Sequence, residues 1–362
     1  MDKIRVGVIG LGNMGERHCR VFNSMAQVNF MGVSDLLEER GHLIQEKYEV
    51  PYYSDFHDML EKVDAVSIAT TTPGHFPIGM ECLAQGKHLF IEKPIALTVE
   101  QAQSLVELAE ERKKILMVGH IERYNPAFSE LQSLLISRQS EEAVAINIRR
   151  LSPFDTSQTD VDVVSDLMIH DLDLVLKMLG RVPDAIETFG RSVFTSTIDH
   201  AVATLYYHDG PVISLAASRV TQQKVRAIEL TTSESYIETD LLHKSISIHR
   251  RFVPFYSNQE SPKYRQEGFI ERIFVPSSEP LQLELNDFIQ SIRTGKKPEV
   301  TGQDGLAALA LALEIKRKIL ETSENARATK NVALHAQEFW QHLRISGNPI
   351  LRMNTSSLSA GN

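Results

Sequence analysis

Lys93 carries the amine that is best placed in this sequence to do chemistry. It lies in the stretch Ile91-Glu92-Lys93-Pro94, directly after an apolar run. An amine at such a position can handle the proton of an alcohol if a hydride acceptor lies beside it. The alternative is a surface lysine that precedes a turn-forming proline. The elements that surround Lys93 must therefore decide between the two interpretations.

A glycine-rich turn near the start of the chain predicts a dinucleotide site. An apolar strand is predicted at residues 4–9, GLGNMG follows at 10–15, and a helix is predicted at 16–23. The first glycine of such a motif permits a tight turn, the second lets a pyrophosphate approach the backbone, and the third lets helix and strand pack closely. A helix N-terminus also attracts phosphate. The expected cofactor contacts are Gly10, Leu11, Gly12, Asn13 and Met14.

An acidic residue after the second predicted strand bears on the choice of cofactor. Asp35 follows the apolar run 28–33, about 20 residues beyond Gly15, where a carboxylate binds the adenosine ribose hydroxyls. A carboxylate there repels a 2′-phosphate. Arg40 is the counter-signal, because it could pair with such a phosphate. We expect NAD as the cofactor, with NADP less favoured.

Strands and helices alternate as far as residue 118, which predicts a doubly wound parallel sheet, a Rossmann domain. Strands are predicted at 64–69, 88–91 and 115–118, and helices at 36–48, 77–85 and 99–113. Ligands of such sheets bind beyond the carboxyl ends of the strands, and this places Lys93 at the edge of the site. Further cofactor contacts are expected there from Thr70, Thr71, His75 and Glu92. Simple turns are the alternative for the two threonines.

The pattern changes after this domain to an α+β domain with an open-faced, mostly antiparallel sheet. Strands are predicted at 143–150, 200–207, 212–218, 226–232 and 245–250, helices at 125–136, 281–293, 306–321 and 336–343, and loops at 251–279. We expect a cofactor domain at 1–121, a substrate-binding and oligomerisation domain at 122–353, and a disordered tail at 354–362. The outer face of such a sheet needs cover, so a homodimer or homotetramer is expected.

Residues 163–179 read as a helix with one narrow polar stripe, made by Asp166, His170, Asp173 and Lys177. Because the rest of the helix is apolar, the stripe is expected to face a cleft. An ordinary Asp–His pair at a surface is the alternative. The stripe holds a single histidine and no HExxH or CxxC spacing occurs nearby, so no metal site is expected.

Composition narrows the class of protein. The 362 residues carry a net charge of −9, which argues against a nucleic-acid partner. The two cysteines, Cys19 and Cys82, argue against a disulfide framework. Neither a membrane-spanning apolar run nor a signal peptide is visible, so a cytoplasmic protein without a membrane partner is expected.

The motif GLGNMG at 10–15, Glu92-Lys93-Pro94 and the DLMIH stretch at 166–170 together resemble the Gfo/Idh/MocA oxidoreductases over essentially the whole chain. The resemblance implies that Lys93, Asp166 and His170 meet at the substrate hydroxyl and the nicotinamide. Residues 119–126 and 166–171 are similar to the UDP-N-acetylglucosamine 3-dehydrogenases of that family, enzymes of lipid A or surface-polysaccharide synthesis. Ile121 and Met168 stand where many members have Asn and Gly, which argues against a plain polyol substrate.

The expected reaction is oxidation of a sugar hydroxyl, with C3 of UDP-N-acetylglucosamine as the first choice. His170 suits a proton acceptor near neutral pH, Asp166 would orient it or bind a neighbouring hydroxyl, and Lys93 would stabilise the alkoxide. Whether Lys93 or His170 takes the proton stays open. The substrate contacts expected are Lys93, Arg123, Asn125, Arg149, Asp166 and His170, with Arg150 as a further candidate for the diphosphate. The alternatives are a family enzyme that acts on inositol, a hexose or a dihydrodiol, and a non-catalytic NAD-binding regulator.

Overall fold

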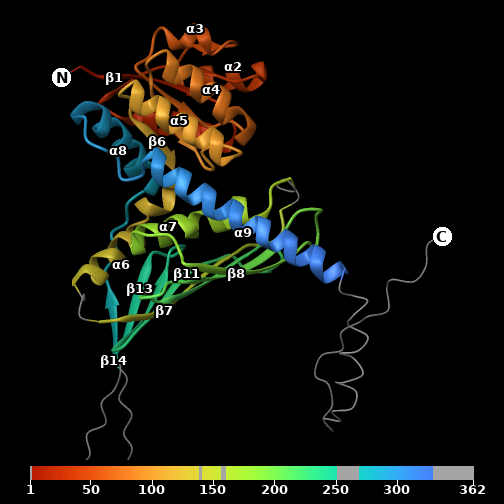
Figure 1. The fold of residues 1–362 in the computed structure, drawn as a ribbon. Helices are drawn as coiled ribbons and strands as arrows, with labels where there is room; N and C mark the ends of the chain where they lie inside the picture. Colours follow the sequence, from red (N-terminus) through yellow and green to blue (C-terminus); the bar gives the residue numbers. More distant parts are fainter. Residues whose placement is uncertain (1, 138–140, 156–159, 251–268, 329–362) are drawn as a thin grey trace, which may run out of the picture. The chain divides into compact units, whose positions relative to one another are not determined.

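The computed structural model describes residues 2–137, 141–155, 160–250 and 269–328, the last six of them without side chains. The chain divides into two compact units, residues 1–319 and 320–362. The first unit contains the two described sheets (Figure 1). Within the second unit, the described residues are the end of helix α9. The predicted helix at 336–343 and the predicted tail at 354–362 lie outside the described residues.

The N-terminal sheet is parallel, as the alternating pattern predicts, and it has six strands, of which the prediction missed the two-residue strand Tyr52–Tyr53. Its strands are β1 (Ile4–Ile9), β2 (Val28–Ser34), β3 (Tyr52–Tyr53), β4 (Ala65–Ile68), β5 (His88–Glu92) and β6 (Leu116–Gly119). Their order is β3-β2-β1-β4-β5-β6, so the direction of winding reverses between β1 and β4. Ligands of doubly wound sheets bind at this reversal. The residues that follow β1, β4 and β5 therefore lie around one place.

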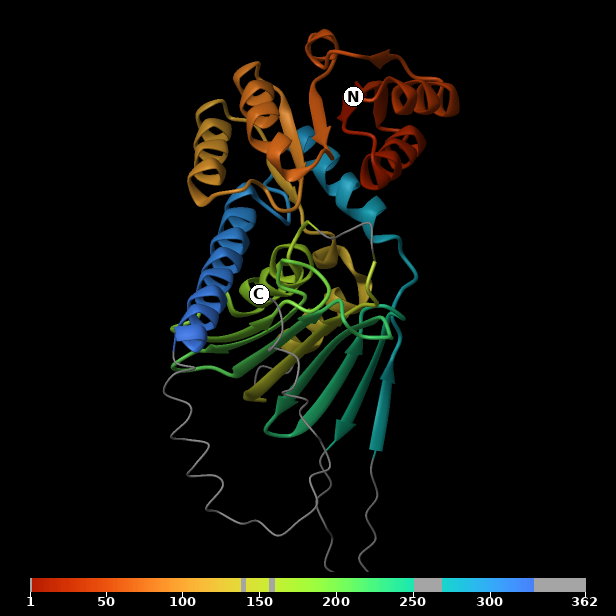
Figure 2. The same cartoon turned by 90° about the vertical axis from the view of Figure 1, so that its right-hand side faces the viewer.

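Helices connect these strands and pack on both faces of the sheet (Figure 2). They are α1 (Asn13–Ser24), α2 (Glu38–Tyr48), α3 (His57–Leu60), α4 (Thr72–Ala84) and α5 (Val99–Glu111). Helix α4 begins five residues before its predicted start at Pro77. Pro73 lies in its first turn, where the missing N–H costs no hydrogen bond. The prediction treated the second proline, instead of the first, as the start of the helix.

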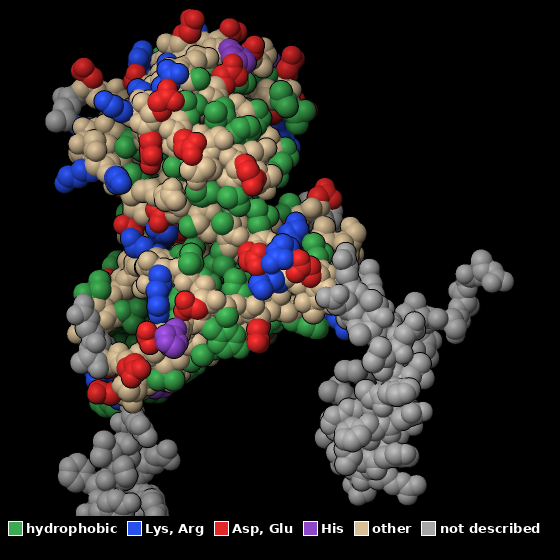
Figure 3. All heavy atoms as spheres, in the orientation of Figure 1, with side chains coloured by type: hydrophobic (Ala, Val, Ile, Leu, Met, Phe, Trp, Pro, Cys, Tyr) green, Lys and Arg blue, Asp and Glu red, His purple; other side chains and the backbone are tan. Residues whose placement is uncertain are grey.

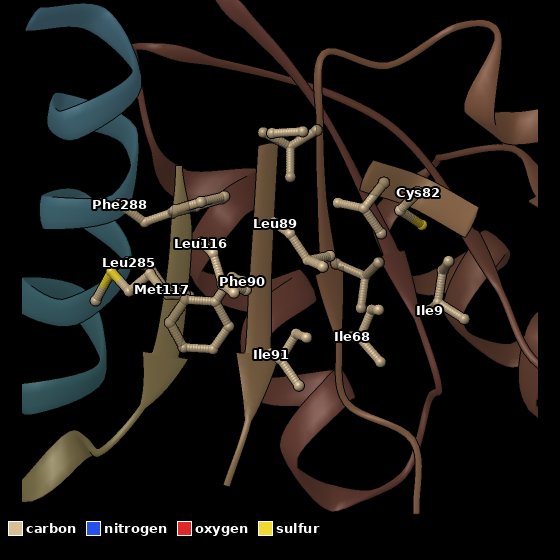
Figure 4. Packing of buried hydrophobic residues seen from close by; sticks show 14 of the residues in the cluster. Ile9, Ile68, Cys82, Leu89, Phe90, Ile91, Leu116, Met117, Leu285 and Phe288 are labelled. Atoms are coloured by element: carbon tan, nitrogen blue, oxygen red, sulfur yellow. The ribbon is translucent and has the colours of Figure 1, made fainter. Parts of the chain in front are cut away.

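A helix from the C-terminal part of the chain completes the core of the N-terminal sheet. Helix α8 (Pro280–Thr294) directs Leu285 and Phe288 toward β5 and β6, where both side chains are fully buried (Figure 4). The ring of Phe288 lies 5.8 Å from that of Phe90 in an edge-on arrangement. Glu284 of α8 consequently lies near enough to Glu92, the residue before Lys93, for their charges to interact.

The second sheet has eight strands, and every neighbouring pair is antiparallel except β7 with β10. The strands are β7 (Ala143–Leu151), β8 (Ala185–Arg191), β9 (His200–Tyr206), β10 (Val212–Ser218), β11 (Val225–Thr232), β12 (Ser235–Asp240), β13 (Ser245–Arg250) and β14 (Phe269–Ile273). The prediction missed β8, β12 and β14. It was wrong to assign residues 269–273 to a loop, because they pair with β13. These strands are short and half polar, so their apolar signal is weak.

Helices cover one face of the second sheet. They are α6 (Pro126–Ser137), α7 (Ile169–Leu179) and α9 (Gly302–Ala328), and their buried side chains join those of the strands in one core. The predicted continuous α-helix at 163–179 is in fact a π-helix over Val164–Met168 followed by α7. A short 3-10 helix, η1 (Ile121–Tyr124), leads from β6 into α6. The fold class predicted from the sequence is thus confirmed for both sheets.

The surface gives two further observations. Acidic and basic side chains are interspersed over the face drawn in Figure 3. Within the described ranges, the structure contains no helix with the length and apolar character needed to cross a membrane.

Candidate active site

The glycine-rich loop has the form that a pyrophosphate site requires. Gly10 has a φ of +88°, and a Cβ there would lie 2.6 Å from the backbone nitrogen of Thr70. A Cβ on Gly15 would lie 1.8 Å from the carbonyl oxygen of Gly10, so this position needs glycine for close packing. Gly12 has open space around it and begins α1 without a side-chain cap. The backbone N–H groups of that helix start thus remain free for an anion.

Asp35 lies beside this loop. Its carboxylate accepts hydrogen bonds from the backbone N–H of Leu11 at 2.6 Å and of Leu37 at 2.8 Å. Leu36 next to it is 96% exposed, an apolar surface at the edge of the loop. The glycine loop, the free helix N-terminus and this carboxylate together fit an adenine dinucleotide. Arg40 is exposed two residues into α2.

His75 joins the loops after β4 and β5. Its two ring nitrogens lie 2.8 Å from the carbonyl oxygen of Pro94 and 3.1 Å from that of Thr70. Burial lowers the pKa of His75, so the ring is neutral and donates to one of these carbonyls at a time. Thr71 precedes α4 and is exposed. His75 is therefore buried and bridges the loops after β4 and β5, whereas Thr71 is exposed.

Lys93 reaches the π-helix that precedes α7. Its Nζ donates to the main-chain oxygen of Asp166 at 2.8 Å and to the Oδ1 of Asp166 at 2.9 Å. The side chains are 18% and 30% exposed, so the pair is shielded but still open to a ligand. An ammonium has three N–H donors, and these two contacts leave one for a substrate oxygen. π-Helical turns occur frequently at functional sites.

His170 lies one turn after Asp166, and its imidazole is neutral. Nδ1 is buried and has no hydrogen-bond partner among the described residues, which leaves Nε2 as the nitrogen that can reach a ligand. The ring of His120 lies 6.4 Å away at a right angle, itself buried with both nitrogens unpaired. Burial, followed by the positive charges of Lys93 and Arg150, holds the pKa of His170 well below its ordinary value of 6.5.

A chain of buried polar groups supports the loop from behind. The carboxylate of Glu92 accepts from the backbone N–H of Lys93 at 3.3 Å and lies 3.1 Å from Nε2 of His18. Nδ1 of His18 lies 2.8 Å from the hydroxyl of Ser67. Burial alone would raise the pKa of Glu92, but the contact with His18 and the charge of Lys93 lower it. Glu92 therefore stays ionised beneath Lys93.

Glu284 of α8 is a second buried carboxyl group near Glu92. It is fully buried, and neither of its oxygens has a hydrogen-bond partner in the part of the chain that the structure describes. Burial raises the pKa of Glu284 well above its ordinary value, and the charges of Glu92, Asp173 and Asp287 raise it further. Burial and these charges therefore favour the protonated form of Glu284.

The structure does not bring three of the predicted substrate contacts to Lys93 and Asp166. The three are Arg123, Arg149 and Asn125. Arg123 is buried and donates to Asp173 at 2.8 and 2.6 Å, with Asp304 at 3.1 Å. Arg149 lies on the opposite face of the second sheet, beside Glu229.

Asn125 lies at the start of α6 instead. Its Oδ1 accepts from the backbone N–H of Ala127 at 3.1 Å, and its Nδ2 donates to the carbonyl oxygen of Leu241 at 2.9 Å. These bonds cap the helix and tie it to the second sheet.

The charges of Arg150 and Arg226 both act on His170, and sequence reasoning missed the second of these arginines. Arg150, considered as a diphosphate ligand, is buried and is neutralised by Asp171 and Glu122, with donor–acceptor distances between 2.6 and 2.8 Å. Arg226 stands directly opposite Arg150 on β11. Arg226 matches no motif, so only the register of the sheet could have revealed it. His18 and Glu284 likewise became visible only through tertiary packing. Among the described residues, no group of His, Cys, Asp or Glu side chains could hold a metal ion.

Known proteins share this architecture and these motifs. The Gfo/Idh/MocA oxidoreductase family with an NAD-binding Rossmann fold matches residues 4–120, and its C-terminal domain matches residues 147–238. UDP-N-acetylglucosamine 3-dehydrogenase of Acidithiobacillus ferrooxidans is 31% identical over 316 residues, 87% of this chain and 97% of that protein. Its solved structure resembles this one with a TM-score of 0.79 at 30% identity, covering 88% of this chain and 98% of that one.

A more distant relative is named for a different substrate, a polyol. Myo-inositol 2-dehydrogenase of Thermotoga maritima is 24% identical over 340 residues, covering 88% of this chain and 97% of that protein. Both relatives are named as dehydrogenases, and the site described above has the groups that oxidation of a hydroxyl requires. The chain therefore belongs to the Gfo/Idh/MocA family and is an NAD(P)-dependent oxidoreductase that acts on CH–OH groups.

Proposed function

We propose that the protein is an NAD-dependent dehydrogenase that oxidises the C3 hydroxyl of UDP-N-acetylglucosamine to the 3-keto sugar nucleotide. The observation that carries the proposal is the contact of Lys93 with Asp166, one turn before His170. This contact gathers a cation, a carboxylate and a neutral imidazole at the carboxyl edge of the parallel sheet. The 31% identity to a UDP-N-acetylglucosamine 3-dehydrogenase over most of both chains supports the choice of substrate.

The residues divide the proton chemistry between them. NAD, when bound, supplies the acceptor for the hydride. His170 is neutral, so Nε2 can accept the hydroxyl proton. Lys93 is held by Asp166 through two hydrogen bonds, and its third N–H stabilises the negative charge that develops on the oxygen. In this arrangement Asp166 positions Lys93 as a hydrogen-bond donor, and His170 is the proton acceptor.

Asp35 supports NAD in preference to NADP. Its carboxylate is fixed beside the glycine loop by two backbone N–H groups. A fixed negative charge at this position repels a 2′-phosphate and accepts hydrogen bonds from ribose hydroxyls. The exposed Arg40 on the following helix could instead pair with a 2′-phosphate. A direct comparison of KM for NAD and for NADP tests the preference for NAD.

A substrate panel tests the proposed function. The purified protein is incubated with NAD and, separately, with UDP-N-acetylglucosamine, UDP-glucose, free N-acetylglucosamine and myo-inositol, and NADH formation is followed. We expect the highest kcat/KM with UDP-N-acetylglucosamine. Turnover of myo-inositol without turnover of any UDP-sugar would overturn the proposal and would favour the activity named for the Thermotoga maritima relative.

A further inference from the structure

We propose that Arg226 binds the diphosphate of the substrate beside the reacting sugar. The proposal rests on the proposed function, because it assumes a nucleotide sugar. It replaces Arg123, Arg149 and Arg150, which the sequence suggested, with an arginine that lies in no recognised motif.

Arg226 lies on the face of the second sheet that carries the candidate active site. Strand β11 places it directly opposite Arg150 of β7. Side chains alternate along a strand, and Ile228 and Leu230 of the same parity are buried in the core beneath the helices. Arg226 therefore projects toward α7 and the π-helix, whereas Arg149 projects from the opposite face.

The guanidinium of Arg226 is only partly used by the protein. Its Nη1 donates to the carbonyl oxygens of Leu151 at 2.7 Å and Val225 at 2.8 Å. Within the described part of the chain, its Nε and Nη2 have no hydrogen-bond partner, and no carboxylate forms an ion pair with it. Arg123 and Arg150 differ in this respect, because each is engaged by two carboxylates.

The electrostatic surroundings of Arg226 favour an added anion. Its side chain is half-buried, and burial together with the neighbouring charge of Arg150 lowers its pKa to about 10. Asp171 and Glu122 act in the opposite direction, but their hydrogen bonds are directed to Arg150. Arg226 is thus a protonated, partly desolvated cation, and a phosphate would offset that cost.

The position also suits the substrate. The charge of Arg226 acts on both His170 and Asp166, so the three groups share one region. In a nucleotide sugar the first phosphate is bonded through oxygen to the sugar ring that carries the reacting hydroxyl. A guanidinium matches phosphate oxygens with two parallel N–H groups, and here Nε and Nη2 are the pair that remains.

Two arginines on adjacent strands provide a matched experiment. Arg226→Gln removes the charge but keeps an amide donor, and Arg149→Gln makes the same change on the opposite face, where Arg149 contacts Glu229. We expect Arg226→Gln to raise KM for UDP-N-acetylglucosamine about 10- to 100-fold, the range for loss of a charge-assisted hydrogen bond. KM for NAD should not change, and Arg149→Gln should behave like the wild type.

Binding of UDP alone separates recognition from catalysis. Calorimetric titration with UDP should show a Kd raised by a similar factor in Arg226→Gln, partial recovery in Arg226→Lys, and no effect in Arg149→Gln. Equal unfolding temperatures of the variants and the wild type exclude a folding defect. If Arg226→Gln unfolds at a lower temperature, the test is the comparison of Arg226→Lys with the wild type. An unchanged KM and Kd in the Arg226 variants of an enzyme that oxidises UDP-N-acetylglucosamine would overturn this inference and leave the proposed function intact. A wild-type protein that oxidises no UDP-sugar would overturn both.

Discussion

At the scale of single residues, the site is governed by which side chains keep a charge when they are buried. Glu92 stays ionised because His18 and Lys93 face it, whereas Glu284 has no hydrogen-bond partner among the described residues and its protonated form is favoured. His170 is neutral because burial and the surrounding cations disfavour its protonation. The candidate site therefore combines one neutral base with a lysine whose Nζ is hydrogen-bonded to Asp166.

The lowered pKa of His170 predicts the pH dependence of the reaction. The neutral ring is the proton acceptor, and it stays neutral at pH values well below 6.5. We expect kcat/KM for oxidation to stay level as the pH falls through 6.5 and to decrease only at lower pH. A pH profile of the wild type measures this. A decline centred at or above pH 6.5 would contradict the assignment of His170 as the acceptor.

Glu284 predicts a pH-dependent stability. Its pKa is raised in the folded protein, so the folded state binds the proton more tightly than the unfolded state, and its stabilising effect is lost as pH rises above about 4.5. Glu284→Gln should therefore increase the free energy of unfolding at pH 8, by about 1.4 kcal/mol for each unit of pKa displacement, with little change at pH 4. Chemical unfolding at both pH values tests this, with the exposed Glu61→Gln as control. Equal effects at the two pH values would refute it.

At the scale of elements, caps and loops hold the residues in place. Asn125 was expected to contact the substrate, but its bonds to Ala127 and Leu241 support the start of α6. Asn125→Ala should lower the free energy of unfolding by about 1–2 kcal/mol, typical of a lost cap, and should leave KM for the sugar unchanged. Asn125→Asp, which keeps the accepting oxygen, should recover part of the loss. A raised KM for the sugar with an unchanged free energy of unfolding in Asn125→Ala would instead support Asn125 as a substrate contact.

The sequence predicts elements well where a local rule fixes them. Strand β1, the glycines and α1 follow from the motif at 10–15, and Lys93 follows from its place after β5. The stripe on residues 163–179 predicts the side of the helix that carries Asp166 and His170. The sequence could not predict partners that depend on strand register or tertiary packing. Strand pairing places Arg226 opposite Arg150, and the packing of α8 buries Glu284.

At the scale of the whole molecule, the second sheet has one face without cover in the described part of the chain. On that face Phe189, Tyr206 and Val212 are 52%, 37% and 44% exposed. Apolar side chains on adjacent strands of an open sheet favour association. The domain boundaries at residues 121 and 353 and the homo-oligomer remain predictions.

Substitution on the open face tests the predicted oligomer. Phe189→Glu places a charge opposite Val202, and it should reduce the mass measured by light scattering. Glu61→Gln on the N-terminal domain should leave the mass unchanged. A wild-type protein that is monomeric at micromolar concentration, or a Phe189→Glu variant of unchanged mass, would refute association through this face.

The central claim is that Lys93 and His170 together carry out the oxidation, and their substitution tests it most directly. kcat for oxidation of UDP-N-acetylglucosamine is measured in Lys93→Met and His170→Ala, with Lys87→Met, at the other end of β5, as the control. We predict losses of roughly 100- to 10,000-fold for each of the first two variants, with NAD binding retained, and wild-type turnover for the control. Wild-type turnover in Lys93→Met and His170→Ala would contradict the account.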